Sequence, residues 1–231
     1  LVDSLNQNLI KAVELANKAL IAYPKSIGAQ NSKNMISGIK HPELSLQTKA
    51  TIEPNKAAQL LITYKNLDTV YFKLYKRPIN EQTEAELDEK EVLFKFLAQN
   101  KHLKKWFVVV PKSTDFNTHT LVTKIDGLDF GKYLLISQNT DNNESSKIIN
   151  HTNFTVTNFA VTNRLLAKNL REYYVVNTTT GAAIKGAKIQ QRKYNNRGVF
   201  VNSQLLTTTE LGNATTDEIQ GVANAIVYQN K

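Results

Sequence analysis

An alternation of apolar and polar side chains with a period of two runs through most of the chain after its first 42 residues. In residues 58–66, AQLLITYKN, the side chains of Leu60, Ile62 and Tyr64 fall on one side of the backbone. Successive side chains of a strand point to opposite faces of a sheet, so this period is typical of β-strands that bury one face. The pattern restricts the chain to folds built mainly from strands.

The alternating runs are short, and turn residues separate them. We predict a first set of strands at residues 44–52, 58–66, 70–77, 93–98, 104–110, 118–125 and 132–139, and a second set at residues 154–162, 171–177, 185–193, 199–209 and 223–230. Strands do not alternate with helical runs, which argues against a parallel sheet. The sequence therefore predicts a mainly β chain with two antiparallel, immunoglobulin-like β-sandwiches.

The first 42 residues have helical periodicity instead. Residues 4–22 carry an apolar stripe at three- and four-residue steps, and Pro24 ends this helix. A second helix is expected at about residues 26–39, with four inward side chains, Ile27, Met35, Ile36 and Ile39. The turn ALIAYPKSIGA resembles that of tetratricopeptide-type repeats, so the pair is either the last unit of an upstream array or a brace packed on the strands after it.

The domain limits follow from these changes of period. Residues 139–153, NTDNNESSKIINHTN, are polar and predict a surface loop with a boundary near its end. We expect a helical pair at 1–42, a first sandwich at 43–150 and a second at 151–231. The chain starts without Met and stops just after a strand-like run, so we expect a piece of a longer protein.

Composition excludes several kinds of chemistry. The chain has no cysteine, which rules out disulfides, thiolate metal sites and cysteine nucleophiles. The net charge of +9 is spread as single Lys and Arg residues, so a solvated surface is the simpler interpretation than an anionic partner. The longest apolar run, residues 106–110, is short against the roughly 20 residues of a membrane-spanning helix.

Titratable residues offer no local catalytic or metal-binding pattern. The candidates are the histidines His41, His102, His119 and His151, the acidic pair Glu81 and Glu84, and the strand-end residues Asp115 and Asp126. The histidines are too far apart in sequence for a local metal site, and His119 alternates with apolar residues, which favours a structural role. The acidic pair lies in a charge-rich insert, where solvation is expected, and strand-end aspartates usually form Asx turns.

One segment has the composition of a nucleic-acid platform. Residues 100–107, NKHLKKWF, place three lysines beside two aromatic rings, namely Lys101, Lys104, Lys105, Trp106 and Phe107. Such a basic, aromatic segment can stack nucleotide bases. The alternation instead puts Trp106 on the same face as the valines two and four residues later, as in a core strand. We therefore expect no nucleic-acid partner.

Known phosphate and hydrolase motifs are absent from the sequence. No HExxH, GxSxG, GxxxxGK[ST] or GxGxxG pattern occurs, and Gly181 and Gly186 lie between two strands, where no phosphate cradle forms. Asn-x-Ser/Thr sequons at Asn143, Asn150, Asn153, Asn177 and Asn213 arise by chance in an Asn- and Thr-rich chain. We expect no catalytic, cofactor-binding or metal-binding residue, no cofactor and no enzyme activity.

A hairpin in the second set has a defined sidedness. In residues 171–190, Tyr173 and Val175 face one way and the residues that alternate with them face the other. We expect Gly181 to adopt positive φ in the turn and Gly186 to allow a close approach of backbones. After the turn, Ala187 and Ile189 are expected to return to the core.

This hairpin, YYVVNTTTGAAIKGAKI, resembles the strand-turn-strand of macroglobulin-type domains. Three further segments resemble bacterial α2-macroglobulin-like proteins in the same order: residues 62–76, ITYKNLDTVYFKLYK; residues 106–137, WFVVVPKSTDFNTHTLVTKIDGLDFGKYLLIS; and residues 154–164, FTVTNFAVTNR. The helical pair resembles the lead-in of the large forms of this family in Bacteroidetes.

The resemblance implies a structural role. Family members are large envelope-associated protease traps, and many capture the protease through a cysteine-containing thioester, which this chain lacks. It implies two macroglobulin-like sandwiches in the N-terminal scaffold, partnered by other domains of the same protein and, through the full-length protein, by target proteases. Membrane association would come from a lipid anchor outside this piece, in the periplasm or on the outer surface.

A second hypothesis is a binding module. A cell-surface adhesion or glycan-binding sandwich would present an exposed aromatic platform, for which the candidates are Tyr64, Tyr71, Tyr75 and Tyr194. An enzyme ranks third because no residue set has catalytic spacing.

Overall fold

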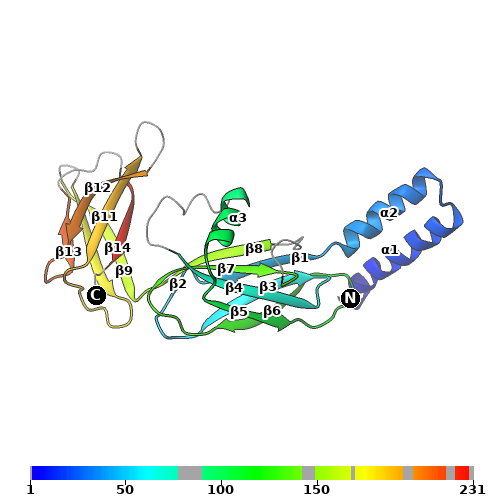
Figure 1. Cartoon of the computed structure of the whole chain (residues 1–231), viewed down its shortest axis with the longest axis horizontal. Coiled ribbons are helices and arrows are strands. Elements are labelled where there is room, and N and C mark those ends of the chain that lie inside the picture. The colour runs from blue at the N-terminus through cyan, green and yellow to red at the C-terminus, as the bar shows by residue number, and fades with distance from the viewer. Residues whose placement is uncertain are drawn as a thin grey trace. The chain divides into compact units, whose positions relative to one another are not determined.

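The computed structural model describes residues 2–77, 90–141, 149–167, 170–194, 200–216 and 222–228 (Figure 1). The elements in chain order are α1 (Val2–Ala22), α2 (Ile27–Lys40), β1 (Glu43–Thr48), β2 (Thr51–Ile52), β3 (Ala58–Lys65), β4 (Thr69–Arg77), α3 (Lys90–Gln99), β5 (Lys104–Val109), β6 (His119–Ile125), β7 (Gly131–Gln138), β8 (Ile149–Val156), β9 (Phe159–Leu165), β10 (Arg171–Asn177), β11 (Lys188–Tyr194), β12 (Phe200–Thr207), β13 (Asn213–Thr215) and β14 (Val222–Tyr228). The prediction of a mainly β chain behind two N-terminal helices is confirmed.

The chain divides into two compact units between Val156 and Thr157, later than the boundary expected after residue 150. The single strand predicted at 154–162 is wrong, because β8 and β9 belong to different sheets. Phe154 and Val156 are buried in the first core, and the Phe159 amide then donates to the Thr157 hydroxyl at 3.1 Å where the chain turns. The apolar alternation continues across this turn and hides the break.

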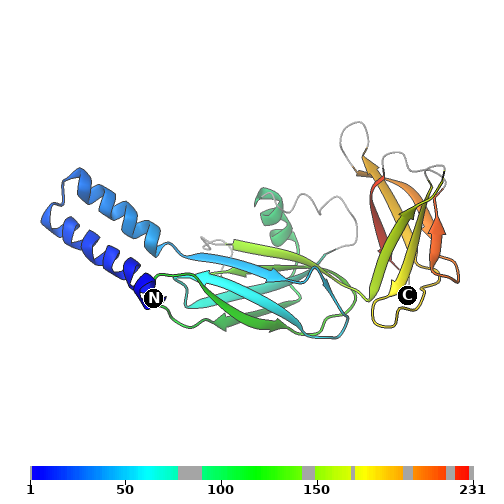
Figure 2. The same cartoon turned by 180° about the vertical axis from the view of Figure 1, so that it is seen from behind.

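Two sheets face each other in the first unit. One has the order β1-β3-β6 and the other β2-β8-β7-β4-β5, and all pairs are antiparallel except β2 with β8. The inward residues of β3, β4 and β7 form the centre of the core, where Leu60, Ile62, Phe72 and Leu135 have no exposed surface. Figure 2 shows the two layers from the opposite side. Residues 44–52, predicted as one strand, form β1 and β2.

The strand predicted at 93–98 is wrong, because these residues lie in α3. Leu93, Phe96 and Leu97 recur at helical spacing and pack against Tyr75 on the outer face of the five-stranded sheet. A short apolar run fits both a strand and a helix when the residues on either side do not continue its periodicity. The second face of this sheet therefore carries its own small apolar core.

The helices α1 and α2 contact each other through small side chains. Val13, Ala16 and Ala29 are the buried apolar residues of this pair in the described part of the chain. The inward placement expected for Ile27 and Met35 is wrong, since 84% and 46% of their surfaces are exposed. The Ser26 hydroxyl accepts a hydrogen bond from the Ala29 amide at 3.0 Å, which starts α2 with Ala29 inward and Ile27 outward. None of the described helices has the length and apolarity to cross a membrane.

The second unit has sheets of order β13-β10-β9 and β12-β11-β14. The predicted sidedness of its central hairpin is confirmed, because Tyr173 and Val175 are buried. Ala187 and Ile189 join them in the core, as expected. This unit is thus a small sandwich whose apolar and aromatic core also encloses Gln191, which donates to the Tyr173 hydroxyl at 3.1 Å.

The hairpin glycines differ from expectation in one respect. Gly181 adopts φ +70°, as the predicted turn requires. Gly186 adopts φ +75° with open space where a Cβ would lie, so the expectation that glycine is needed there for a close backbone approach is wrong. The close approach occurs at Gly212, where an added Cβ would lie 2.6 Å from the Val175 carbonyl oxygen.

Candidate functional site

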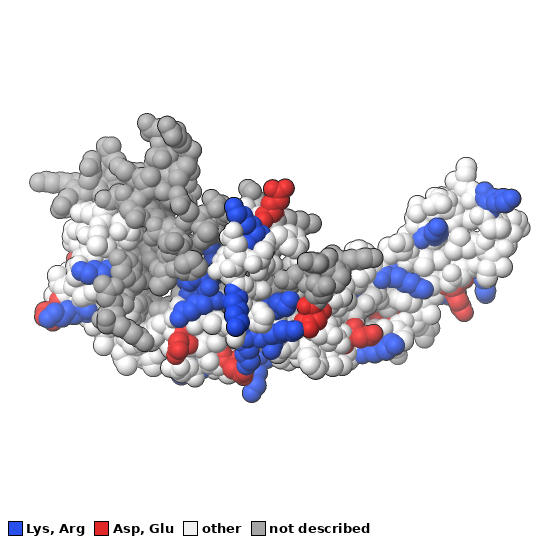
Figure 3. Space-filling view, in the orientation of Figure 1, with Lys and Arg blue, Asp and Glu red and all other residues white. Residues whose placement is uncertain are grey.

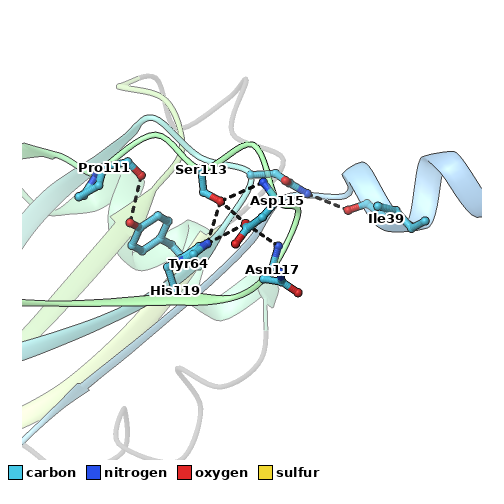
Figure 4. A network of polar contacts seen from close by, with 8 residues as sticks. Ile39, Tyr64, Pro111, Ser113, Asp115, Asn117 and His119 are labelled. Atoms are coloured by element: carbon cyan, nitrogen blue, oxygen red, sulfur yellow. Dashed lines mark hydrogen bonds and ion pairs between the residues drawn. The ribbon is translucent and has the colours of Figure 1, made fainter. Parts of the chain in front are cut away.

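A dense polar cluster of the first unit lies in the loop between β5 and β6 and at the start of β6 (Figure 4). His119 Nε2 lies 2.8 Å from Ser113 Oγ and 2.9 Å from Asp115 Oδ1. The Ser113 hydroxyl donates to Asp115 Oδ1, and the Asn117 amide donates to the same oxygen at 3.0 Å, which forms the Asx turn expected for Asp115. Phe116 at the tip of the turn has φ +60°.

This cluster has the residue types of a Ser-His-Asp triad but not its geometry. In a triad, one imidazole nitrogen contacts the serine and the other contacts the carboxylate. Here Ser113 and Asp115 both contact the same nitrogen of His119, and the hydroxyl proton is directed at the carboxylate. The serine is therefore not activated by the histidine. The arrangement fixes the loop.

The cluster is joined to the end of β3. The rings of Tyr64 and His119 lie opposite each other in the β3–β6 ladder, with centroids 5.9 Å apart, and the Tyr64 hydroxyl donates to the Pro111 carbonyl at 3.1 Å. Burial, followed by the nearby charge of Asp115, raises the pKa of Tyr64. Next to it, Asn66 Nδ2 donates to the Ile39 carbonyl at 2.8 Å and so ties the end of α2 to the β3–β4 turn.

The Asp115 carboxylate is expected to give the first unit a defined response to acid. Hydrogen bonds from Ser113 and then from His119 hold the pKa of Asp115 well below its usual range. A depressed pKa stabilises the folded state above the unfolded value of about 4, and that stabilisation is lost as pH falls toward the folded pKa. We expect Asp115→Asn to lower the urea midpoint at pH 7, with the difference from wild type closing as pH falls below about 4.

Urea unfolding of both proteins between pH 7 and pH 2 measures this effect. Asp129→Asn, at an exposed carboxyl in the loop before β7, is the matched control and is expected to leave the midpoint unchanged. A gap between wild type and Asp115→Asn that stays constant over the whole pH range would contradict the role assigned to the carboxylate.

The basic stacking platform considered at residues 100–107, and not favoured there, does not assemble. Trp106 faces the core, where its ring stacks on Phe72 with centroids 5.1 Å apart, whereas Phe107 lies on the outer face beside Tyr71. The two strand lysines have carboxylate partners, Lys104 with Asp126 and Lys105 with Asp141. Trp106 therefore contributes to the core, as its alternation predicts.

A groove lies between β5 and β6, which are edge strands of the two facing sheets. Its volume is about 320 Å³, and it is lined by Leu74, Lys104, Trp106, Phe107, Val108, Thr123, Lys124, Ile125, Asp126 and Leu128. The Lys104–Asp126 ion pair links one edge of the groove to the other. Apart from this ion pair and Lys124, no charged side chain lines the groove, and its floor is apolar.

The remaining predicted residues are dispersed. His102 lies with its ring against Tyr75, His151 is on β8, and His41 follows α2. Glu81, Glu84 and Asn143 lie outside the described residues, as does the Tyr194 side chain. The other sequon residues all lie within strands: Asn150, Asn153, Asn177 and Asn213. Within the described ranges, no three His, Asp or Glu side chains gather as they would around a metal ion.

A polar network on the second unit was missed from the sequence. The Arg164 guanidinium donates to Glu172 at 2.7 Å and lies over the Tyr174 ring, and Asn213 Nδ2 donates to Glu172 at 2.9 Å. The hydrogen bond from Asn213, ahead of that from Tyr174, lowers the pKa of Glu172. The register of β9 against β10 pairs Arg164 with Glu172, so an opposite-charge match across the hairpin was the available signal.

The fold places the chain in a structural class, the antiparallel β-sandwich proteins. Within that class, the structure is similar to native alpha-2-macroglobulin from Escherichia coli spanning domains MG0-NIE-MG1, with a TM-score of 0.62, 13% identity, and coverage of 82% of this chain and 61% of that one. A structure of the same protein spanning NIE-MG1 has a TM-score of 0.58 and 14% identity, with coverage of 83% and 94%.

No protein-family model matches the chain, and no curated protein matches its sequence. At these identities the structural likeness establishes the fold: macroglobulin-like, immunoglobulin-type β-sandwiches preceded by helices. The resemblance drawn from the sequence is confirmed at that level. The chain spans less than two thirds of the longer solved structure, which is itself a set of domains of a larger protein.

Proposed function

We propose that the chain is a structural scaffold segment of a bacterial α2-macroglobulin-like protease inhibitor of the Bacteroidetes type. The full-length protein would reside in the cell envelope, held by a lipid anchor outside this segment. The direct partners of the segment would be other domains of the same protein, and proteases would be partners of the whole molecule.

One observation carries the proposal. The similarity to the alpha-2-macroglobulin structure extends over 82% of the chain and so covers more than a single sandwich. A single sandwich would be weak support, because many unrelated proteins contain one. A match over several consecutive parts in the same order is more specific than a match to one domain. The segment itself holds no thioester cysteine, so capture would take place elsewhere in the protein.

The described side chains suit a stiff spacer. In the first unit an inter-sheet core and a second apolar core under α3 hold the five-stranded sheet from both faces. Close-packed protein interiors deform little under load. A rigid segment of this kind would keep a cleavable bait region and a capture region at defined positions.

The proposal is tested with the full-length protein and a protease assayed on two substrates. A trap encloses the protease, so we expect slower cleavage of a large protein substrate and unchanged cleavage of a short peptide. A matched deletion variant, in which only the segment of residues 1–231 is removed from the full-length protein, is expected to lose this selectivity. Equal inhibition of both substrates, or none, would contradict trapping.

The adhesion hypothesis is not favoured by the described tyrosines. Tyr64 and Tyr75 are 3% and 2% exposed, so neither presents a ring to a glycan, and Tyr71 is half-buried. Catalysis is not part of the proposal either, because the Ser113–Asp115–His119 cluster lacks the required geometry.

A further inference from the structure

Strand β5 is the last strand of its sheet, and among the described residues it pairs with β4 alone. The Val110 amide donates to the Asp68 carbonyl at 3.0 Å, which marks Val110 as directed toward β4. Hydrogen-bonded and non-bonded residues alternate along an antiparallel ladder. The N–H and C=O groups of Lys105, Phe107 and Val109 are therefore directed at the free edge.

This edge is apolar on both faces. On the outer face Phe107 and Val109 are 62% and 67% exposed. On the inner face Trp106 and Val108 line the groove between β5 and β6. An exposed apolar edge strand is a template for the addition of another strand, and folded proteins usually cover or interrupt such an edge. A strand laid along β5 would cover apolar side chains on both faces.

The charge along this segment has one sign. Residues 101–112 contain four lysines and no acidic residue. Two of them, Lys104 and Lys105, stand at the start of β5, where each has one carboxylate partner, Asp126 and Asp141 respectively, and Lys112 follows the end of the strand. Figure 3 shows lysine and arginine side chains gathered on the face of the first unit that carries β4 and β5. Acidic side chains at both ends of an added strand would complement them.

We propose that the free edge of β5 binds an extended polypeptide segment with an apolar centre and acidic ends, by addition of a strand to the five-stranded sheet. Main-chain hydrogen bonds to Lys105, Phe107 and Val109 supply the register, and the lysines select the charge. Another copy of this chain is a poor occupant, because its β5 brings two further lysines to the same edge. The inference does not depend on protease trapping.

Trp106 is the sole tryptophan of the chain and lines the groove, so its fluorescence reports on the edge directly. The probe is a synthetic peptide of about nine residues, with alternating Val and Thr between paired Glu at each end. We expect a saturable change of Trp106 emission that weakens as salt is raised. The same peptide with Lys in place of Glu is expected to bind at least tenfold more weakly.

Val109→Pro removes a main-chain donor from the free edge without removing a hydrogen bond to β4. We expect it to weaken binding of the acidic peptide about tenfold, since a main-chain hydrogen bond and the close approach of the added strand are both lost. Val109→Thr keeps the donor and a similar shape, and is expected to bind as the wild type does. Circular dichroism melting curves establish that each variant is folded.

Three results would overturn the proposal. The first is no saturable change of Trp106 emission at acidic-peptide concentrations up to about 1 mM, because a weaker dissociation constant would be no more than collisional contact. The second is equal binding of the acidic peptide by Val109→Pro and Val109→Thr. The third is equal binding of the Lys-ended and the acidic peptide by the wild type. Sedimentation tests the competing occupant: dimers that Val109→Pro abolishes would identify a second copy on this edge instead. A monomeric wild type that binds the acidic peptide supports the proposal.

Discussion

Replacing Phe72 by alanine is expected to lower the free energy of unfolding of the first unit by about 3–5 kcal/mol. Phe72 lies in the middle of β4 with no exposed surface, and its ring stacks on Trp106 at 5.1 Å. The substitution removes a whole ring from a closely filled core, and neighbouring strands cannot collapse into the space without breaking their ladder. The cost therefore includes a cavity as well as lost apolar burial.

Urea unfolding followed by far-ultraviolet circular dichroism measures this loss, with Trp106 emission as a local probe of the same unit. Phe107→Ala is the matched control, because it removes an identical ring from the neighbouring strand β5, at a position that is 62% exposed. We expect it to cost about 1 kcal/mol or less, as for most surface substitutions. Similar losses for the two variants would mean that the sidedness of β5 and β4 is misassigned.

The second large effect is expected at Gly212. Alanine there would adopt φ +71°, which costs an L-residue about 1–2 kcal/mol, and its Cβ would lie 2.6 Å from the Val175 carbonyl oxygen. The Val175 amide donates to the Gly212 carbonyl at 2.8 Å, so the chain at Gly212 cannot retreat without losing this bond. We expect Gly212→Ala to destabilise the second unit by about 3 kcal/mol or more.

Gly181→Ala separates the two causes. Gly181 has nearly the same φ, +70°, but an added Cβ would meet open space. Its cost is expected to be about 1–2 kcal/mol, from the backbone conformation alone. Calorimetry gives the stability of both variants, and hydrogen exchange at the Val175 amide reports the local effect. If Gly212→Ala and Gly181→Ala cost the same, the clash with Val175 is not real.

Most strands were predictable because their signal is local. An alternation such as that around Leu60 and Ile62 states both the secondary structure and the buried face, and the structure buries these residues. The hairpin of Tyr173 and Val175 behaves in the same way. Three-residue apolar signals are weaker: Leu93, Phe96 and Leu97 fit a helix or a strand until the outer face of the sheet provides a partner.

The polar cluster illustrates how much of a site could be predicted. Asp115 and His119 were visible as candidates, and the Asx turn at Asp115 is a local property. Ser113 and Asp115 both contact the same nitrogen of His119 because of the loop conformation and the position of the Tyr64 ring across the ladder. Residue types alone are compatible with a catalytic triad, and the geometry that excludes one is not encoded in spacing.

By itself, the sequence determined the period of each segment and the buried face of most strands, because these depend on neighbours along the chain. The absence of cysteine chemistry follows from composition alone. Tertiary structure alone decided that residues 154–162 divide between two units, that Gly212 rather than Gly186 is sterically restricted, and that β5 is left at an edge. The physical reason is the same in each case: strand partners and backbone contacts join residues distant in sequence, and no local pattern specifies which strand lies next to which.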